Sequence, residues 1–302
     1  MGNPSRVLVG KISELWRYPV KTMQGELLET ASITHKGLSG DRSFALVDKN
    51  SGRIISAKNP NKWKHVFNFS SSTFVSEEGS NSPPRISISF SDGDTVFTDD
   101  ENVNEILSKK IGTPVILTSQ VPENATMEKV TLEDDEREKT QAPSHLEKLS
   151  PFDFFDGGPL HILTTRSLNR LQDIYKEGNF EARRFRPNIV IDSDDTDYGS
   201  DTGLSMEQSY EDLMLEIGDT VKVKITKPTV RCIITTLAQP DLPKDNKVLK
   251  TIDMENGGYL GVYTQTLEPG SVKMGDLVWM VGSKLTSGRS SSTTFQDSLP
   301  LA

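Results

Sequence analysis

Short segments of strand-type composition, separated by tight turns, recur along this 302-residue chain and constrain its fold more than any other feature. Residues 85–90 alternate between polar and apolar side chains, a Ser-Asp-Gly-Asp turn follows, and residues 95–97 return, which predicts a β-hairpin. The segments 217–223 and 274–280 echo each other, because each places a Gly-Asp turn before a strand-like run. Many short strands and few helices predict a mainly β (α+β) protein with a barrel-like β core.

Two helices stand out from the strand pattern. The first is expected between a cap at Asp99 or Asp100 and an end at Gly112, because the apolar side chains between them recur at helical spacing. The second is expected to start at Thr165, with apolar side chains again on one face, and to close at Gly178.

Composition changes along the chain predict four regions. Residues 1–118 form a smaller β-rich N-terminal domain, and residues 151–282 form the barrel-like domain. The span 119–150 is polar and acidic, with two prolines and few large apolar residues, so we expect a linker or a long surface loop. The span 283–302 is rich in Ser and Thr, and we expect a disordered tail.

Charge and hydropathy indicate where the protein works. The net charge of -9 opposes non-specific binding to nucleic acid or to an anionic membrane, although a local basic pocket can still form. Apolar runs fall short of the roughly 20 residues that a membrane helix needs. The first residues also lack the apolar stretch of a signal peptide. We therefore expect a cytoplasmic protein without nucleic-acid or membrane partners.

Cys232 is the single cysteine, so no internal disulfide can form. Pro228 should begin an irregular segment after a strand, and Arg231 lies directly beside the thiol. A neighbouring cation favours the thiolate, which is the form that attacks electrophiles and binds soft metals. The alternative is a small core residue, because a lone cysteine among β-branched residues is more often buried packing.

Basic residues at strand ends, in turns and at one helix start could bind a phosphate. Arginine forks pair with phosphate in bidentate fashion, and the free N–H groups of a helix start also suit it. Taken singly, each residue could equally make an ordinary surface ion pair. The group consists of Lys21, Arg42, Thr165, Arg183, Arg184 and Arg186.

Several other classes of site fit poorly. His-Glu-x-x-His and paired Cys-x-x-Cys motifs are absent, which argues against zinc. The chain also lacks a phosphate-binding P-loop, a dinucleotide-binding glycine motif after a strand, and the Gly-x-Ser-x-Gly elbow of hydrolases. Gly157-Gly158-Pro159 is expected to be only a turn, and His161 only a core histidine.

Several short motifs, in this order along the chain, resemble the MOSC family, which takes its name from the C-terminal domain of molybdenum cofactor sulfurase. The matching stretches are Tyr18-Pro19-Val20-Lys21-Thr22, Gly40-Asp41-Arg42, Leu163-Thr164-Thr165-Arg166-Ser167-Leu168, Arg184-Phe185-Arg186-Pro187-Asn188, Arg231-Cys232-Ile233-Ile234-Thr235-Thr236 and Pro269-Gly270-Ser271-Val272-Lys273-Met274-Gly275-Asp276. The resemblance spans residues 7–282. It implies a β-barrel domain of the type that precedes MOSC, followed by the MOSC domain itself.

Within the family, the chain looks like the amidoxime-reducing branch. That resemblance implies a molybdenum cofactor, with Cys232 as catalytic residue and protein ligand of the metal. The residues implied to hold the pterin and its phosphate are Lys21, Thr22, Arg42, Thr165, Arg186, Asn188 and Arg231. The implied activity is a two-electron reduction of N-hydroxylated or N-oxide small molecules. A plant-type iron–sulfur cluster needs four cysteines and flavin or NAD motifs are lacking, so a separate electron-transfer protein is expected.

One departure and two alternatives accompany this resemblance. Many relatives read Val-Asp-Pro-x-Thr-Gly where this chain has 237–243, a loop expected to line the substrate entrance. The first alternative is a sulfur or molybdenum-cofactor carrier that uses a persulfide on an exposed Cys232. The second is a non-catalytic binding module in which Cys232 is a buried core residue.

Overall fold

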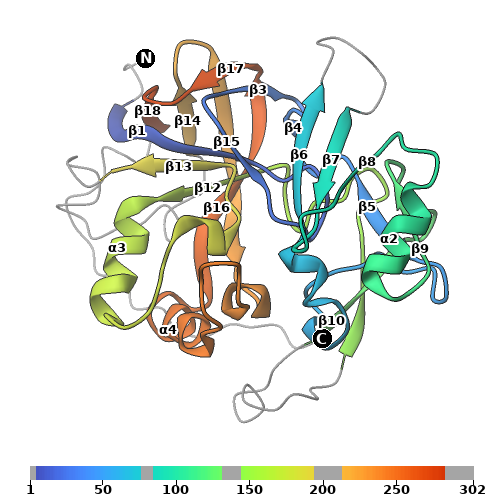
Figure 1. Cartoon of the computed structure of the whole chain (residues 1–302). Helices are drawn as coiled ribbons and strands as arrows, with labels where there is room; N and C mark the ends of the chain where they lie inside the picture. The colour runs from blue at the N-terminus through green and yellow to red at the C-terminus, as the bar shows by residue number, and fades with distance from the viewer. Residues whose placement is uncertain (1–4, 76–83, 131–143, 194–212, 283–302) are drawn as a thin grey trace.

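A closed barrel dominates the computed structural model, which describes residues 5–75, 84–130, 144–193 and 213–282. Seven strands form it in the order β13-β12-β16-β15-β14-β18-β1, and β1 closes the ring by pairing with β13 as well as with β18 (Figure 1). The barrel strands are β1 (Ser5–Arg17), β12 (Leu160–Thr164), β13 (Ile189–Asp192), β14 (Met214–Ile217), β15 (Val221–Val230), β16 (Tyr259–Glu268) and β18 (Leu277–Gly282). The predicted mainly β fold with a barrel core is confirmed.

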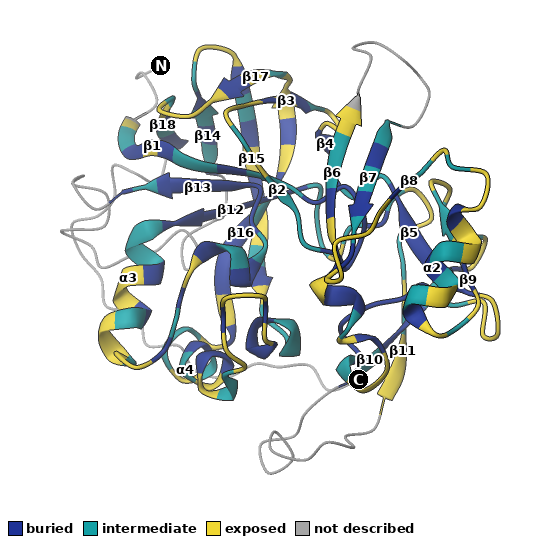
Figure 2. Ribbon diagram, in the orientation of Figure 1, coloured by how far each residue is buried: buried dark blue, intermediate teal, exposed yellow. Residues whose placement is uncertain are grey.

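Alternation of side chains explains the barrel wall. In β15, Val221, Val223 and Ile225 are buried in the core, whereas Lys222 and Lys224 between them point outward, which is the period of two expected for a strand. Figure 2 shows the buried inner strands against the exposed outer faces of the helices.

A parallel connection joins β12 to β13 through the helix α3 (Thr165–Ile174). The helix starts where the sequence predicts it, because the side chain of Thr164 accepts a hydrogen bond from the N–H of Ser167 as an N-cap. It ends at Ile174, ahead of the expected Gly178. The other barrel-side elements are η3 (Ala182–Phe185), η4 (Ile233–Thr236) and α4 (Asn246–Asn256).

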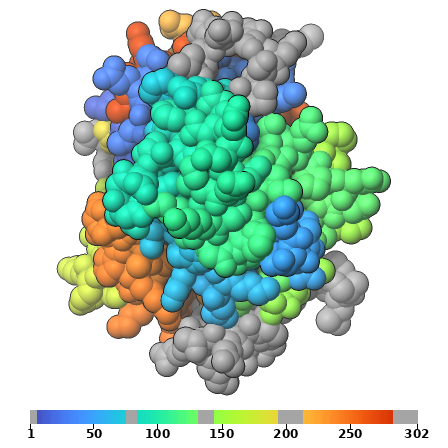
Figure 3. Space-filling view, turned by 45° about the vertical axis from the view of Figure 1, so that its right-hand side comes forward, coloured from blue at the N-terminus to red at the C-terminus, as the bar shows by residue number. Residues whose placement is uncertain are grey.

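A second unit packs beside the barrel around a separate apolar core, drawn from residues 20–115. The predicted hairpin is confirmed as β7–β8, and the predicted helix as α2, which ends at Gly112 in the left-handed conformation. Figure 3 shows the green residues of this unit at the centre of one face, with orange residues near 250 at the lower left. Its elements are β5 (Ala45–Asp48), α1 (Pro60–Trp63), η1 (Val66–Asn68), β6 (Ser70–Val75), β7 (Arg85–Ser89), β8 (Thr95–Phe97), α2 (Val103–Ile111) and β9 (Val115–Thr118).

Strands from the start of the chain pair with strands from its end. β2 (Glu26–Leu28) extends the barrel sheet beside β1, while β3 (Thr30–Thr34) lies between β4 (Gly37–Leu38) and β17 (Gly270–Lys273). The β3–β17 pairing joins segments far apart in the sequence, whereas β1–β2 and β3–β4 are pairings between neighbouring segments. The domain boundaries at 1–118 and 151–282 remain a prediction.

Two strands lie within the span that the sequence analysis assigned to a linker or surface loop. β10 (Thr126–Val130) and β11 (Ser144–Lys148) pair in antiparallel fashion. Met127 and Val130 are buried, so this polar segment has enough apolar side chains to anchor a strand. The predicted tail 283–302 lies outside the described residues.

Candidate functional site

A cleft of about 430 Å³ lies between the barrel and the second unit. Six of its lining side chains are cationic and three are acidic, whereas the whole chain carries a net charge of -9, so the positive charge of the cleft is local. The ionisable lining residues are Arg42, Lys58, Lys129, Glu147, Asp156, His161, Arg186, Lys227, Arg231, Cys232, Asp253 and Tyr263. Small-molecule sites occur preferentially at such domain interfaces.

Cys232 lies in the wall of this cleft, directly before η4, and its thiol is free and partly exposed. The backbone at this point is fixed, because the N–H and the Oγ1 of Thr235 donate to the carbonyl of Cys232 at 3.1 and 2.9 Å. The position contradicts the hypothesis of a buried core cysteine, since the side chain is half-buried and faces a cavity.

Arg42 and Arg186 both make cation–π contacts with the ring of Tyr18. Their guanidinium carbons lie 4.6 and 4.2 Å from the ring centre, so the two like charges are held close to each other. Arg42 forms an ion pair with Asp41, whereas the Nη1 of Arg186 donates to the carbonyl of Met23 at 2.7 Å. Burial, and then the charge of Arg42, lower the pKa of Arg186 to about 10. An anion placed against these guanidinium groups would relieve their repulsion.

Arg231 and His161 meet on the barrel side of the cleft. The Nη2 of Arg231 donates to the carbonyl of Phe185 at 2.6 Å, while its buried Nε has no hydrogen-bond partner. Its Nη1 lies 3.4 Å from the Nε2 of His161, whose Nδ1 lies 3.3 Å from the carbonyl of Arg186. Burial, and then the charge of Arg231, hold the pKa of His161 well below its usual range. A neutral imidazole with its proton on Nδ1 satisfies both contacts.

An alternating network of charges forms the opposite wall. The carboxylate of Asp156 accepts from Lys21 at 2.8 Å and from Lys58 at 3.0 Å, and Lys58 also pairs with Glu147 at 3.2 Å. Burial opposes ionisation of Asp156, but the two lysines hold its pKa well below the usual range. Burial likewise disfavours the charge on Lys58, but Asp156, the nearby Cys232 and Glu147 raise the pKa of Lys58 overall. The strands β10 and β11 thereby contribute to the site.

The structure brings together most of the residues expected at the site. Those that line the cleft are Arg42, Arg186, Asn188, Arg231 and Cys232. Lys21 is buried and reaches the cleft through its ion pair with Asp156. Asn188 also joins strands, because its side chain accepts from the N–H of His161 and donates to the carbonyl of Trp16.

Two of the residues that the family resemblance implies at the site are placed elsewhere. The hydroxyl of Thr22 donates to the carbonyl of Ile55 at 3.1 Å, so it serves the backbone beside Lys21. Thr165 lines a different cavity, where its Oγ1 accepts from the N–H of Ser193. The helix start at Thr165 therefore does not face Cys232.

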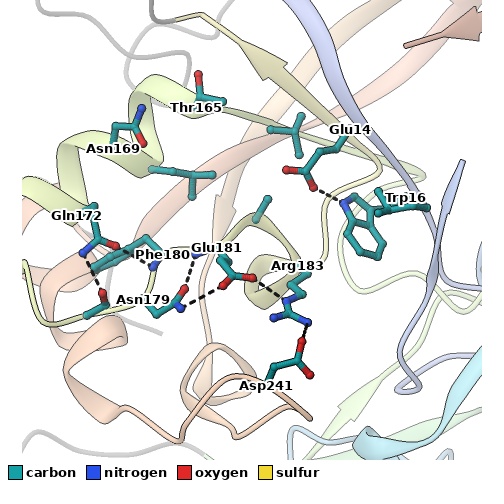
Figure 4. A pocket seen from close by; sticks show the side chains of 15 residues that line it. Glu14, Trp16, Thr165, Asn169, Gln172, Asn179, Phe180, Glu181, Arg183 and Asp241 are labelled. Atoms are coloured by element: carbon teal, nitrogen blue, oxygen red, sulfur yellow. Dashed lines mark hydrogen bonds and ion pairs between the residues drawn. The ribbon is translucent and has the colours of Figure 1, made fainter. Parts of the chain in front are cut away.

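That second cavity, of about 750 Å³, lies between β1, α3 and η3 (Figure 4). Trp16 donates to Glu14 on one side, and Arg183 pairs with Glu181 and Asp241 at 2.8 Å each on the other. Asp241 belongs to the loop 237–243, which is expected to line the substrate entrance. This loop lines the second cavity through Asp241 and contributes no lining residue to the Cys232 cleft.

Sequence reasoning missed eight of the cleft's ionisable residues, among them Lys58, Asp156, His161 and Tyr263. His161 was assigned to the core, which its burial supports, but its ring also faces the cleft. Asp156 precedes a Gly-Gly-Pro turn and a barrel strand, and a carboxylate at such a strand start is a usable signal. Lys58 and Tyr263 carry no local signal, because only the tertiary fold brings them to Cys232.

Ligand chemistry narrows what the cleft could hold. The described residues contain no group of three or more His, Cys, Asp or Glu side chains that could hold a metal ion on their own. A metal at Cys232 would therefore need further ligands from a bound organic group. Within the described part of the chain, no helix is both long and apolar enough to cross a membrane.

Comparisons with known proteins agree with this architecture. The family model described as MOSC N-terminal beta barrel domain matches residues 9–66, and the model described as MOSC domain matches residues 150–279. No curated protein matches the chain.

Two solved structures are among those that match the chain. The YUAD protein from Bacillus subtilis shows 10% identity and a TM-score of 0.44, over 92% of this chain and 98% of its own. YiiM from Geobacillus stearothermophilus shows 20% identity and a TM-score of 0.28, over 40% of this chain and 54% of its own. MOSC domains occur in proteins associated with the molybdenum cofactor. The chain belongs to the MOSC family, with the family's N-terminal β-barrel domain ahead of the MOSC domain.

Proposed function

We propose that this protein binds the molybdenum cofactor in the Cys232 cleft and reduces N-hydroxylated or N-oxide small molecules. The observation that carries the proposal is a free, partly exposed thiol in the wall of a cavity in which cations outnumber acids. Each turnover would take two electrons and two protons, break the N–O bond and release the oxygen as water. An N-hydroxylated substrate would gain an N–H bond, and an N-oxide would leave as the free amine.

The residues present fit such a cofactor. Arg186 makes no ion pair with a carboxylate of the described residues, and neither does Arg231, whose Nε is buried without a partner. Guanidinium groups without a carboxylate partner are suited to bind the phosphate of the pterin. Because no cluster of protein ligands surrounds Cys232 within the described residues, the dithiolene of the pterin would supply the remaining sulfur ligands.

Each residue then has a defined task. Cys232 would ligate the metal, and the bound cofactor would supply the two-electron redox chemistry. Lys21, Arg42, Arg186, Asn188 and Arg231 would hold the pterin and its phosphate, with Thr22 shaping the backbone beside Lys21. Thr165 leaves this set, because it lines the other cavity.

Electrons would come from a separate protein. With one cysteine, the chain cannot provide the four thiolates of a plant-type iron–sulfur cluster. Purified, cofactor-loaded protein should therefore not reduce benzamidoxime with NADH alone, and should do so with a chemical donor such as reduced methyl viologen. A cytoplasmic location stays a prediction.

The partial exposure of Cys232 also favours a second candidate, a carrier of sulfur or of the cofactor that uses a cysteine persulfide. The two functions differ in how the thiol reacts. A carrier's thiol should be alkylated readily by iodoacetamide in protein as purified. A metal-bound thiol should resist alkylation until the cofactor is removed.

The deciding experiment is elemental analysis for molybdenum on gently purified protein from a host that makes the cofactor. We expect near-stoichiometric metal in the wild type and a fall of roughly tenfold or more in Cys232→Ala and Arg186→Met. Arg183→Met is the matched control, because it removes an arginine from the other cavity and should keep the metal. Wild-type protein without molybdenum would contradict the proposal and leave the carrier function.

A further inference from the structure

A row of three side chains crosses the barrel wall from the depth of the cleft to its rim. Tyr263 of β16 lies directly opposite His161 of β12 on one side and Lys227 of β15 on the other. Directly opposed residues of neighbouring strands point to the same face, and two strand spacings cover roughly 10 Å. All three residues line the cleft, His161 being buried beside Arg231 and Lys227 exposed.

Tyr263 is fixed in the middle of this row. The turn Gly157-Gly158 packs against this side chain so closely that an added Cβ would lie 2.6 Å from the ring at Gly157 and 3.0 Å from the ring at Gly158. The ring of His161 lies 5.4 Å from that of Tyr263, centre to centre. The phenol hydroxyl makes no hydrogen bond to any described residue. This ring is therefore a rigid surface in the cleft with an unused hydrogen-bonding group.

Positive charge remains uncompensated at the rim. The ammonium of Lys227 lies 5.7 Å from the centre of the Tyr263 ring and forms no ion pair with the described residues. The second rim lysine, Lys129, has its nearest carboxylate at 4.0 Å on Glu147, which already pairs with Lys58 at 3.2 Å. Asp253 is the other acid of the rim, and it lies on α4 across the cleft.

We propose that Tyr263 and Lys227 select the substrate. The ring of Tyr263 supports a planar body, and Lys227 receives an anionic group at the end of the row remote from His161. The substrate class is thus a planar N-hydroxylated or N-oxide compound that carries a carboxylate. This inference rests on the proposed reductase function, and it names the residues that would decide which N–O compounds the enzyme prefers.

Steady-state kinetics with reduced methyl viologen test the proposal, using benzamidoxime and 4-carboxybenzamidoxime as a neutral and an anionic substrate. In the wild type, KM should be lower for the carboxylated compound. Lys227→Met should raise that KM roughly three- to tenfold, with kcat and the KM for benzamidoxime nearly unchanged. Lys224→Met is the matched control, because it removes an exposed lysine from the same strand outside the cleft.

Charge reversal gives a sharper contrast. Lys227→Glu should reverse the preference, so that 4-aminomethylbenzamidoxime is favoured over the carboxylated compound. Equal KM values for the neutral and anionic substrates in the wild type, unchanged in Lys227→Met, would overturn the proposal.

A binding measurement separates this inference from the reductase proposal. Terephthalamate, the carboxylated amide analogue, should bind the cofactor-free protein, as measured by ligand-observed NMR. Its affinity should be lower for Lys227→Met than for Lys224→Met. Loaded protein that reduces neither amidoxime would refute the reductase function, while this difference in binding would still support the anion site. Equal binding to both variants would refute the anion site, whether or not the loaded protein is active.

Discussion

Backbone strain is concentrated at the cleft. Among the described residues, Thr22, Arg42, Asn124 and Arg186 are the non-glycine residues with positive φ. Such conformations cost on the order of 1–3 kcal/mol and persist only where the surrounding structure imposes them. Arg42 and Arg186 both lie against Tyr18, and Thr22 follows a buried lysine of the site. Strained conformations of this kind cluster at active sites and ligand-binding sites, so their position here supports the proposed role of the cleft.

His161 should make the protein sensitive to acid. Because burial and Arg231 hold its pKa well below the ordinary value, the unfolded chain binds a proton there below about pH 6.5 and the native protein does not. Stability should therefore fall as pH drops through this window, by up to about 1.4 kcal/mol per pH unit. We expect His161→Gln to flatten this dependence, measured as the free energy of urea unfolding between about pH 7 and pH 5.

His35→Gln provides the control, because His35 is exposed. Its unfolding free energy should follow the wild-type pH dependence. If the unfolding free energy depends on pH equally in wild type and His161→Gln, the native protein already carries the proton on His161. The proposal of a neutral imidazole at the site would then be wrong.

Residues of the site differ in how visible they are in the sequence. Cys232 and Arg231 form a local pattern, a lone thiol beside a cation after a strand, and the sequence predicts their importance. Lys58 and Asp156 form an ion pair only after the second unit meets the barrel. Tyr263 joins them through strand register, which a single sequence does not reveal.

Elements were predictable where their signals are local. The hairpin β7–β8 has its turn residues, and α2 has its apolar face and its glycine end, so both appear as expected. The N-cap position of α2 is Asn102, instead of Asp99 or Asp100, and its side chain makes no cap hydrogen bond. Asp100 accepts from the N–H of Phe97 in the turn ahead of the helix. β10 and β11 were missed because a few buried side chains in a polar segment give little signal.

Barrel closure depends on one glycine. At Gly10, β1 passes from β18 to β13, and a Cβ there would lie 1.9 Å from the carbonyl oxygen of Asp192. A methyl group would force the two strands apart. We expect Gly10→Ala to lower the free energy of unfolding by roughly 3 kcal/mol, measured by urea denaturation.

Gly52→Ala isolates the steric contribution. Gly52 has a positive φ, but nothing lies within 4 Å of the added Cβ, so only the backbone conformation opposes the change. That cost should be about 1 kcal/mol. Similar losses for the two variants would contradict the idea that close packing at β1–β13 closes the barrel.

The chain crosses between its two units more often than the sequence suggests. β1 belongs to the barrel of the C-terminal strands, and β3 pairs with β17, although both come from the predicted N-terminal domain. The chain then forms the second unit before it returns at Leu160. This arrangement places the cleft between segments that enter it from both sides, so neither domain alone would carry the site.

Circular permutation would test this crossing of the chain. Ser5 and Gly282 are directly paired on β1 and β18, so a flexible linker of about six residues can join them. A chain running from residue 39 to 282 and then, through this linker, from 5 to 38 keeps every barrel strand. We expect it to unfold in one cooperative transition near the wild-type midpoint, followed by near-UV circular dichroism. The fragment 151–282 should show no such transition, because its barrel stays open without β1. Cooperative unfolding of this fragment would instead show that the barrel forms without the N-terminal strands.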